Sequence, residues 1–285
     1  AAGGGVDTFM RVLAQGMGAS PGHNYILDNR PSDGGNVSLA FVARAEPDGY
    51  NLCLYVPSPM AVVPHLQKVP YDSMKDFTYI ALYCFVPLAF YVKNDSPFKS
   101  WADVIKYAKE KGAPLPFAMV GPGTPHHLFA EMLRGMTGIQ TSYVPYRGSQ
   151  PAITDVIAGR IQASSSPLFS LEPSVSAGKA RYLAVLNSRR FEGVPDVPSV
   201  REVIPGFDAP PLWSGFFGPP GLPQSIVSRL HGEITRIAAT TEVKARLFAG
   251  GLLLVNSSPE ELAQAIRRDI QTVDGIVKRA KIQPE

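Results

Sequence analysis

The chain has 285 residues, of which 45% are hydrophobic and 18% are charged; this is enough apolar material for one large core or two ordinary ones, and the length favours two domains. The net charge of +3 comes from basic residues that are scattered along the chain. They form no stripe interleaved with aromatic residues, which argues against a nucleic-acid partner. No apolar stretch reaches the ~20 residues that a membrane span requires.

Helix and strand patterns alternate along the first half of the chain. Apolar residues at helical spacing predict the first helix, and Ser100 is the predicted N-cap of the last helix in this half. In chain order we expect a helix at 7–17, a strand at 25–27, a helix at 36–45, strands at 50–56, 77–84 and 88–92, and a helix at 101–111.

The second half continues this alternation. We expect a strand at 116–120, a helix at 125–136, a strand at 141–144, a helix at 150–158, strands at 160–164, 182–186 and 213–217, and helices at 223–239 and 259–279. Ser149 is the predicted N-cap of the helix at 150–158. Strands that alternate with helices predict an α/β fold with mainly parallel sheets.

Two segments are candidates for domain boundaries, residues 93–97 and 205–213, because both are polar or rich in proline. If both are crossovers, the first domain is discontinuous and consists of residues 1–93 and 214–285, and the second consists of residues 94–213. The C-terminal helix is long enough to reach over the second domain. Such a pairing of chain ends predicts a hinge and a cleft.

The two cysteines, Cys53 and Cys84, each lie in an apolar stretch typical of a strand. Two buried free thiols are the first expectation, and a disulfide between neighbouring strands is the alternative in an oxidising compartment. No spacing of cysteine and histidine resembles a zinc site, and neither a dinucleotide fingerprint nor a phosphate-binding loop occurs. No cofactor and no metal are expected.

Two glycine-rich loops, at residues 3–7 and 121–124, run directly into predicted helices. Glycine lets a backbone approach a ligand closely, and the unpaired N–H groups of a helix N-terminus attract anions. Four or five charge-assisted hydrogen bonds of roughly 1.5–3 kcal/mol each would give micromolar affinity without a basic side chain. Ordinary turn chemistry is the alternative. Because the first loop begins at Ala1, a strand is expected to precede it.

Several further residues lie where predicted strands end. Ser58 is a possible donor, and the serines 164–166 either supply hydroxyls to a ligand or form a solvated turn. Trp213 is expected in core or hinge packing, with ligand stacking as the alternative. The neighbouring His126 and His127 suggest an enzyme at first sight. However, no Gly-x-Ser-x-Gly elbow and no placed acidic pair accompany them, so catalysis is not favoured.

Nine segments in the right order, spanning nearly the whole chain, resemble the Bug (TctC-type) family of periplasmic solute-binding proteins. They are GGGVD at 3–7, NRPSDGGN at 29–36, PDGY at 47–50, PYD with KDF at 70–77, GPGT with HL at 121–128, VPYRG at 144–148, GK at 178–179, PDVPS at 195–199 and PPGLP at 219–223. Each motif is weak alone, and the ordered set is specific.

The resemblance implies two α/β domains joined by crossover hinge strands, which is the type II periplasmic-binding-protein or Venus-flytrap fold. It implies a periplasmic receptor, expected to be a monomer, that delivers carboxylates to the membrane subunits of a tripartite tricarboxylate transporter. It places the ligand at the first loop and at the Gly-x-Gly-Thr loop. The ligand residues expected are Gly3, Gly4, Gly5, Val6, Asp7, Ser58, Gly121, Gly123, Thr124, His127, Arg147, Ser165 and Ser166.

Three departures from the family pattern bear on the ligand. Ala1 and Ala2 stand where the family has two prolines, which puts the stiffness of the first loop in doubt. Gln162 and Ser166 stand where the family often has aspartate. An amino acid, whose ammonium needs an acidic partner, is therefore less expected than a simple, dicarboxylic or aromatic acid. Arg147 replaces a lysine and is either a bidentate carboxylate fork or a solvent-facing charge.

Two other functions stay open at this point. A ligand-presenting sensory module would share the same binding site and differ in its membrane partner. An α/β hydrolase or transferase would turn its ligand over instead of binding it stoichiometrically.

Overall fold

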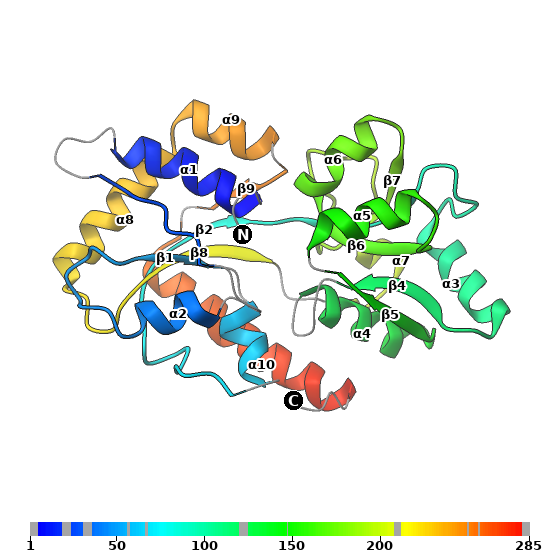
Figure 1. Cartoon of the computed structure of the whole chain (residues 1–285), viewed down its shortest axis with the longest axis horizontal. Helices are drawn as coiled ribbons and strands as arrows, with labels where there is room; N and C mark the ends of the chain where they lie inside the picture. The colour runs from blue at the N-terminus through cyan, green and yellow to red at the C-terminus, as the bar shows by residue number, and fades with distance from the viewer. Residues whose placement is uncertain are drawn as a thin grey trace. The chain divides into compact units, whose positions relative to one another are not determined.

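The computed structural model describes residues 5–18, 24–30, 36–55, 58–65, 68–119, 125–146, 148–207, 212–249, 251–255 and 257–280. They divide into two units (Figure 1). Among the described residues, unit 1 is formed by the chain up to Phe85 and by Trp213–Gly275, and unit 2 by Val86–Leu212 and residues 276–280. The sequence predicts the first boundary at residue 93. It falls at Phe85 instead, because the strand that begins at Leu88 hydrogen-bonds to unit 2.

Unit 1 is a four-stranded sheet with helices. Its elements are α1 (Gly5–Gly18), α2 (Asn36–Val42), β1 (Cys53–Tyr55), a π-helical turn (Ser58–Val62), a 3₁₀ turn (Val63–His65), β2 (Thr78–Phe85), β8 (Trp213–Gly218), α8 (Gln224–Ala238), α9 (Thr241–Ala249), β9 (Leu253–Leu254) and α10 (Pro259–Ala280). The strand order is β1-β8-β2-β9.

All strand pairs in the unit 1 sheet are antiparallel, so the expectation of mainly parallel sheets is wrong here. The connections between the units explain this direction. The chain leaves unit 1 at the end of β2 and returns at the start of β8. Phe85 and Trp213 therefore face each other across the two strands, which must run in opposite directions.

Unit 2 is a five-stranded sheet in the order β5-β4-β6-β3-β7. Its elements are β3 (Leu88–Lys93), α3 (Trp101–Lys111), β4 (Leu115–Met119), α4 (Pro125–Thr137), β5 (Thr141–Pro145), α5 (Ser149–Ile157), β6 (Ala163–Pro167), α6 (Leu168–Ser176), β7 (Ala180–Val185) and α7 (Val200–Val203). β4 pairs in parallel with β5 and β6, whereas β3 pairs antiparallel with β6 and β7. The parallel expectation thus holds only for β5-β4-β6.

Three local predictions are wrong. Residues 25–27 form irregular chain instead of a strand, and Ile26 is 90% exposed. The strand predicted at 160–164 begins only at Ala163 and continues through the serines. Ser149 is the first residue inside α5, and the N-cap is Gly148 with φ 114° and no side-chain hydrogen bond, a conformation that favours glycine. Helices α6, α7 and α9 and strand β9 were not predicted.

The cap of α3 was predicted correctly. Ser100 Oγ accepts a hydrogen bond from the Asp103 N–H, and the Asp103 carboxylate accepts one from the Ser100 N–H, which makes a capping box. The helix then presents Trp101 to β3, where its ring stacks on Phe90 at a centroid distance of 4.0 Å. Both side chains are fully buried, so they anchor the core of unit 2.

Cys53 and Cys84 are buried free thiols, as expected first. Cys53 is paired with Phe217 and Cys84 with Ser214, so β8 lies between the two cysteines. Strands two positions apart are separated by about 9.6 Å, beyond the ~7 Å over which a disulfide can form. Burial raises the pKa of each thiol to about 12, so neither reacts readily.

We therefore expect that the folded protein keeps both thiols when it is treated with the thiol oxidant diamide. Mass spectrometry after alkylation of the unfolded chain should find two labels. The same treatment of the urea-unfolded chain is the control for the reagent, since it should oxidise the pair. A loss of two hydrogens from the folded protein would contradict the arrangement of β1, β8 and β2.

Candidate functional site

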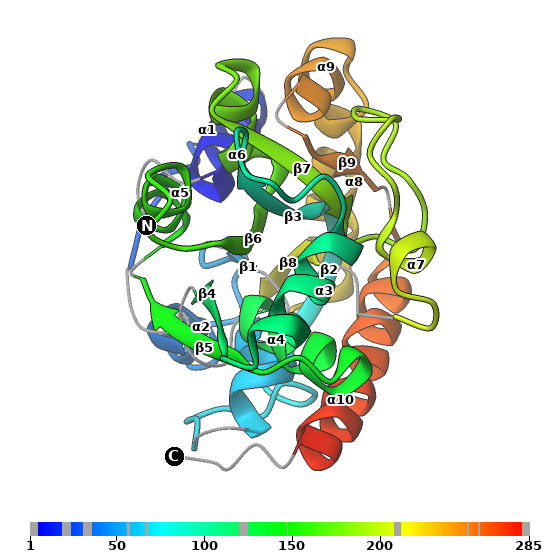
Figure 2. The same cartoon turned by 90° about the vertical axis from the view of Figure 1, so that its right-hand side faces the viewer.

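The parallel strands of unit 2 define a candidate site at their carboxyl ends. From β4 the chain passes through α4 to β5 on one side, and then through α5 to β6 on the other side. Because such crossovers are right-handed, α4 and α5 lie on opposite faces of the sheet, as Figures 1 and 2 show. The carboxyl ends of β4 and β6 therefore form a topological switch point, where α/β sheets bind ligands.

The three serines of β6 have different partners at this edge. All are at most 1% exposed, so the solvated turn is wrong. Ser164 Oγ donates to the backbone carbonyl of Ala118 in β4, at 2.8 Å. Ser165 Oγ lies 3.0 Å from Nδ1 of His126. Ser166 Oγ has no hydrogen-bond partner among the described residues, although a buried hydroxyl without one costs about 1–3 kcal/mol.

His126, the second residue of α4, connects the start of this helix to β6. Its side chain is 7% exposed, and burial lowers its pKa to about 4. The imidazole is therefore neutral at physiological pH and forms a hydrogen bond of 3.0 Å with Ser165, as donor or acceptor according to its tautomer. The contact is unlike a catalytic pair, because no described carboxylate is hydrogen-bonded to the ring.

The next residues of α4 connect the helix to β5. His127 packs edge-on against the ring of Tyr143, with a centroid distance of 5.8 Å. One turn later, Glu131 accepts a hydrogen bond of 2.6 Å from the Tyr143 hydroxyl and lies 2.6 Å from Nη2 of Arg134. Burial lowers the pKa of His127, so both histidines are neutral, and the nearby ion pair cancels its own charge.

The N-terminus of α4 is thereby fixed between two strands, with Pro125 as its first residue. The helix has 13 residues, and its first N–H groups have no partner within the helix. An anion near this end would meet a partial positive charge. The arrangement offers hydroxyl groups, amide N–H groups and neutral rings, which suits recognition of a carboxylate better than bond cleavage.

The other predicted ligand residues can be placed only in part. Ser165 and Ser166 of β6 and His127 of α4 belong to one unit and one sheet edge. Gly5, Val6 and Asp7 are the first residues of α1, and Ser58 begins the π-helical turn of unit 1. The remaining predicted contacts lie outside the described residues: Gly3, Gly4, Gly121, Gly123, Thr124 and Arg147.

Sequence reasoning missed three residues that shape this edge: His126 as the partner of Ser165, and Tyr143 and Glu131 as the brace of α4. A signal existed for Glu131, since it stands four residues after His127 and thus on the same helical face. None existed for Tyr143, which the fold brings in from another strand. No three Cys, His, Asp or Glu side chains gather to hold a metal in the described part of the chain.

Comparison with known proteins assigns the chain to a family. The family model described as "Tripartite tricarboxylate transporter family receptor" (TctC) matches residues 9–282. A curated relative is the protein from the tcbD-tcbE intergenic region of Pseudomonas sp. strain P51, which is 32% identical over 94% of this chain and 80% of its own length.

Two solved structures from Rhodopseudomonas palustris have the same fold. One, described "with adipate", has a TM-score of 0.91 at 28% identity and covers 100% of this chain and 96% of that protein. The other, described as MatC "with bound malate", has a TM-score of 0.86 at 28% identity and covers 97% of this chain and 96% of that one. A solved periplasmic binding protein, BugD, is also similar.

Members of this family are solute-binding receptors, so the hydrolase or transferase alternative is not supported. The two-domain, type II binding-protein fold agrees with these neighbours. No helix among the described residues is long and apolar enough to cross a membrane. The chain is a solute-binding protein and belongs to the TctC family of tripartite tricarboxylate transporter receptors.

Proposed function

We propose that this protein is a periplasmic receptor that binds a small carboxylate without an ammonium group and delivers it to the membrane subunits of a tripartite tricarboxylate transporter. One observation carries the proposal. The buried hydroxyl of Ser166 has no hydrogen-bond partner among the described residues, and Ser166 lies near the carboxyl end of β6, at the switch point of the unit 2 sheet. A carboxylate oxygen would accept that hydrogen bond.

The charge at this edge supports an acid over an amino acid. An ammonium group needs an acidic or carbonyl acceptor, and a buried charge without one is costly. The described groups here are the serine hydroxyls of β6 and two neutral imidazoles. Glu131 is already engaged by Tyr143 and Arg134. Adipate and malate, found with two relatives, also carry carboxylates and no ammonium.

The predicted contacts from the loops at residues 3–7 and 121–124, and from Arg147, remain part of the proposal. In it, the serines of β6 help to orient the carboxylate. A ligand stabilises whichever state of the receptor it contacts more extensively.

Isothermal titration calorimetry with adipate, malate, benzoate and aspartate would test the ligand class. We expect a saturable heat with at least one acid that lacks an ammonium group, and a Kd at least tenfold weaker for aspartate. The bound acid should also raise the melting temperature, because it binds only the folded protein. No heat with any carboxylate, or aspartate as the tightest ligand, would overturn the proposal.

The Ser166→Ala variant should weaken binding of the best acid roughly fivefold to tenfold, because one hydrogen bond contributes about 1–1.5 kcal/mol. Its melting temperature without ligand should stay the same or rise, since a buried unpaired hydroxyl is removed. The matched control is Ser142→Ala in β5, whose side chain is exposed; its affinity should equal that of the wild type. If both variants bound the acid with the same affinity, Ser166 would not be part of the binding site.

A further inference from the structure

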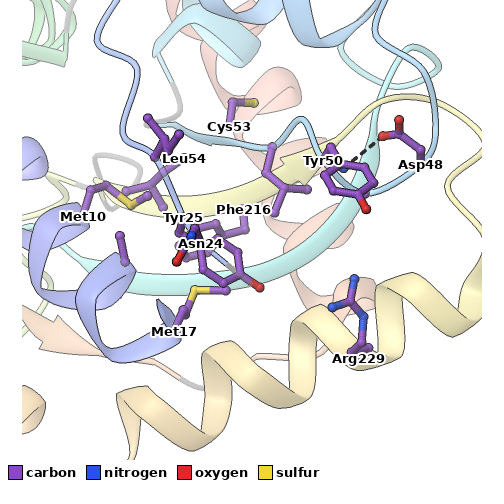
Figure 3. A pocket seen from close by; sticks show the side chains of 14 residues that line it. Met10, Met17, Asn24, Tyr25, Asp48, Tyr50, Cys53, Leu54, Phe216 and Arg229 are labelled. Carbon is purple, nitrogen blue, oxygen red and sulfur yellow. Dashed lines mark hydrogen bonds between the residues drawn. The ribbon is translucent and has the colours of Figure 1, made fainter. Parts of the chain in front are cut away.

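Unit 1 contains a cavity that the proposed carboxylate site does not use. It has a volume of about 300 Å³ and lies among α1, β1, β8, the turn at Asp48–Tyr50 and α8 (Figure 3). All the described residues that line it belong to unit 1. The volume is about twice that of a 150 Å³ engineered cavity that binds benzene, and it is at the lower end of ligand pockets in general.

The walls of this cavity are rich in rings and thioethers. Met10 and Met17 of α1 stand on one side, and Phe216 of β8, Tyr25 and Tyr50 contribute the rings. A thioether adapts its shape and interacts favourably with the edge of an aromatic ring. Aromatic rings in turn prefer other aromatic groups in offset or edge-on contact. The walls therefore favour a flat aromatic molecule.

Two large apolar side chains at the cavity are left open to solvent. Ile26 is 90% exposed and Tyr50 is 85% exposed. Exposed apolar groups at a concave surface mark binding sites more often than isolated ones do.

The elements around the cavity pack closely against each other at two glycines. A Cβ at Gly16 of α1 would lie 2.6 Å from Ile237 of α8, so the close approach of these helices depends on this glycine. Gly49 has a φ of 83°, and a Cβ there would lie 2.7 Å from Ile226. The turn and both helices are therefore closely packed where they surround the cavity.

The charges at the cavity favour a neutral ligand. Among the lining residues that the structure describes, only Asp48 and Arg229 are charged at neutral pH, and their charges are opposite. Asp48 Oδ1 accepts a hydrogen bond of 2.9 Å from the Tyr50 N–H. Arg229 lies 3.6 Å from Glu233, which also accepts a hydrogen bond of 2.7 Å from Tyr25. An anion would have to compete with Glu233 for Arg229.

We propose that this cavity is a second ligand site of the receptor, which takes a neutral aromatic molecule of one ring or two fused rings. None of its described lining residues is among the residues predicted for the carboxylate site, and its chemistry differs from that site. The aromatic plane lies against Phe216 and the two methionines, and Tyr50 and Ile26 cover its outer edge.

Methyl NMR of protein labelled at the methionine methyl groups tests this proposal directly, with indole as the neutral probe and benzoate as an anionic probe of similar width. We expect indole to shift the Met10 and Met17 signals saturably. Met132 and Met136 of α4 should not move, which makes the readout specific for this cavity. Benzoate should shift Met10 and Met17 with an affinity at least tenfold weaker. These signals are independent of the calorimetry on the carboxylate site.

Variants that fill the cavity, compared with a control variant elsewhere in the chain, test whether indole binds there. Ala14→Phe fills it from α1, and Leu54→Trp fills it from β1; each variant should abolish the indole shifts while its melting temperature shows that it is folded. Ala102→Phe, on the exposed face of α3, is the control and should leave them unchanged. The proposal is overturned if indole causes no saturable shift, if the shifts persist in both filled variants, or if benzoate binds there as tightly as indole.

Discussion

At pH 8, the Asp269→Asn variant should be more stable than the wild type, with a melting temperature raised by roughly 5–10 °C. Asp269 of α10 is 5% exposed, and its carboxylate accepts a hydrogen bond of 2.7 Å from the indole N–H of Trp213. Burial raises the pKa of Asp269 to about 7, although the indole N–H and Arg268 both favour the ionised form. At pH 8 the folded protein therefore holds a carboxylate in a poorly solvated place.

The direction of the effect follows from proton linkage. The folded state binds the proton of Asp269 up to a pH of about 7, whereas the unfolded chain releases it near 3.8. The contribution of Asp269 to the free energy of unfolding is thus largest below pH 3.8 and is lost as the pH rises to 7. A pKa that rises from 3.8 to about 7 corresponds to about 4 kcal/mol at most. Asparagine keeps an acceptor for Trp213 and does not ionise.

The pH dependence of the stabilisation distinguishes the ionisation of Asp269 from other effects of the substitution. The stabilisation by Asp269→Asn should be large at pH 8 and vanish at pH 4, where the wild-type carboxyl group is protonated in the folded state. Labelling with 5-fluorotryptophan gives one ¹⁹F signal for each unit, since Trp101 lies in unit 2 and Trp213 in unit 1. Asp196→Asn, at an exposed position, changes the net charge equally and should have little effect. A variant that is less stable than the wild type at pH 8 would contradict the argument.

Elements whose signal is local were predicted well. Helices α1, α3, α8 and α10 lie within two residues of their predicted bounds at each end, because their apolar residues recur at helical spacing and face one side. The cap of α3 is also local, since Ser100 and Asp103 are three residues apart. These features need no knowledge of the rest of the fold.

Elements that depend on distant partners were predicted poorly. The serines of β6 look like a turn because three hydroxyls in a row are costly to bury. They are buried nevertheless, since Ala118 and His126, 46 and 39 residues away, provide partners for two of them. Likewise, the antiparallel unit 1 sheet follows from the return of the chain at Trp213, which no local pattern indicates.

Three of the predicted ligand residues share one sheet edge, and their role in binding stays a prediction. Ser165, Ser166 and His127 do lie on the elements that meet at the switch point of unit 2. The direct partner of Ser165 is His126, however, which the sequence suggested only as a doubtful catalytic group. Two adjacent histidines on a helix point in different directions, about 100° apart, and only the packing of α4 decides which one meets β6.

The His126→Gln variant should lose stability at pH 7.5 but resist acid better than the wild type. Glutamine offers a donor and an acceptor for Ser165 without ionising. Its different shape in a fully buried place should cost about 1–2 kcal/mol at pH 7.5. At pH 4.5 the difference should close or reverse, because the wild type pays a penalty there that the variant does not share.

The penalty comes from the lowered pKa of His126. Burial holds it at about 4, whereas the unfolded chain binds the proton near 6.5. The contribution of a neutral His126 to the free energy of unfolding is therefore complete above pH 6.5 and is lost as the pH falls to 4. The total is about 3 kcal/mol, most of which is lost by pH 4.5. His127 titrates in both proteins, so its contribution cancels.

Urea unfolding followed by the ¹⁹F signal of Trp101 would measure the free energy of unfolding of unit 2 at pH 7.5 and at pH 4.5. Equal acid sensitivity of His126→Gln and the wild type would show that His126 is not held neutral at Ser165. His126 and Asp269 belong to different units and act in opposite directions. Acid weakens unit 2 through His126, and rising pH weakens unit 1 through Asp269. In the wild type at pH 4.5, the folded-state signal of Trp101 should therefore disappear at a lower urea concentration than that of Trp213. As the pH approaches 8, the urea midpoint reported by Trp213 should fall.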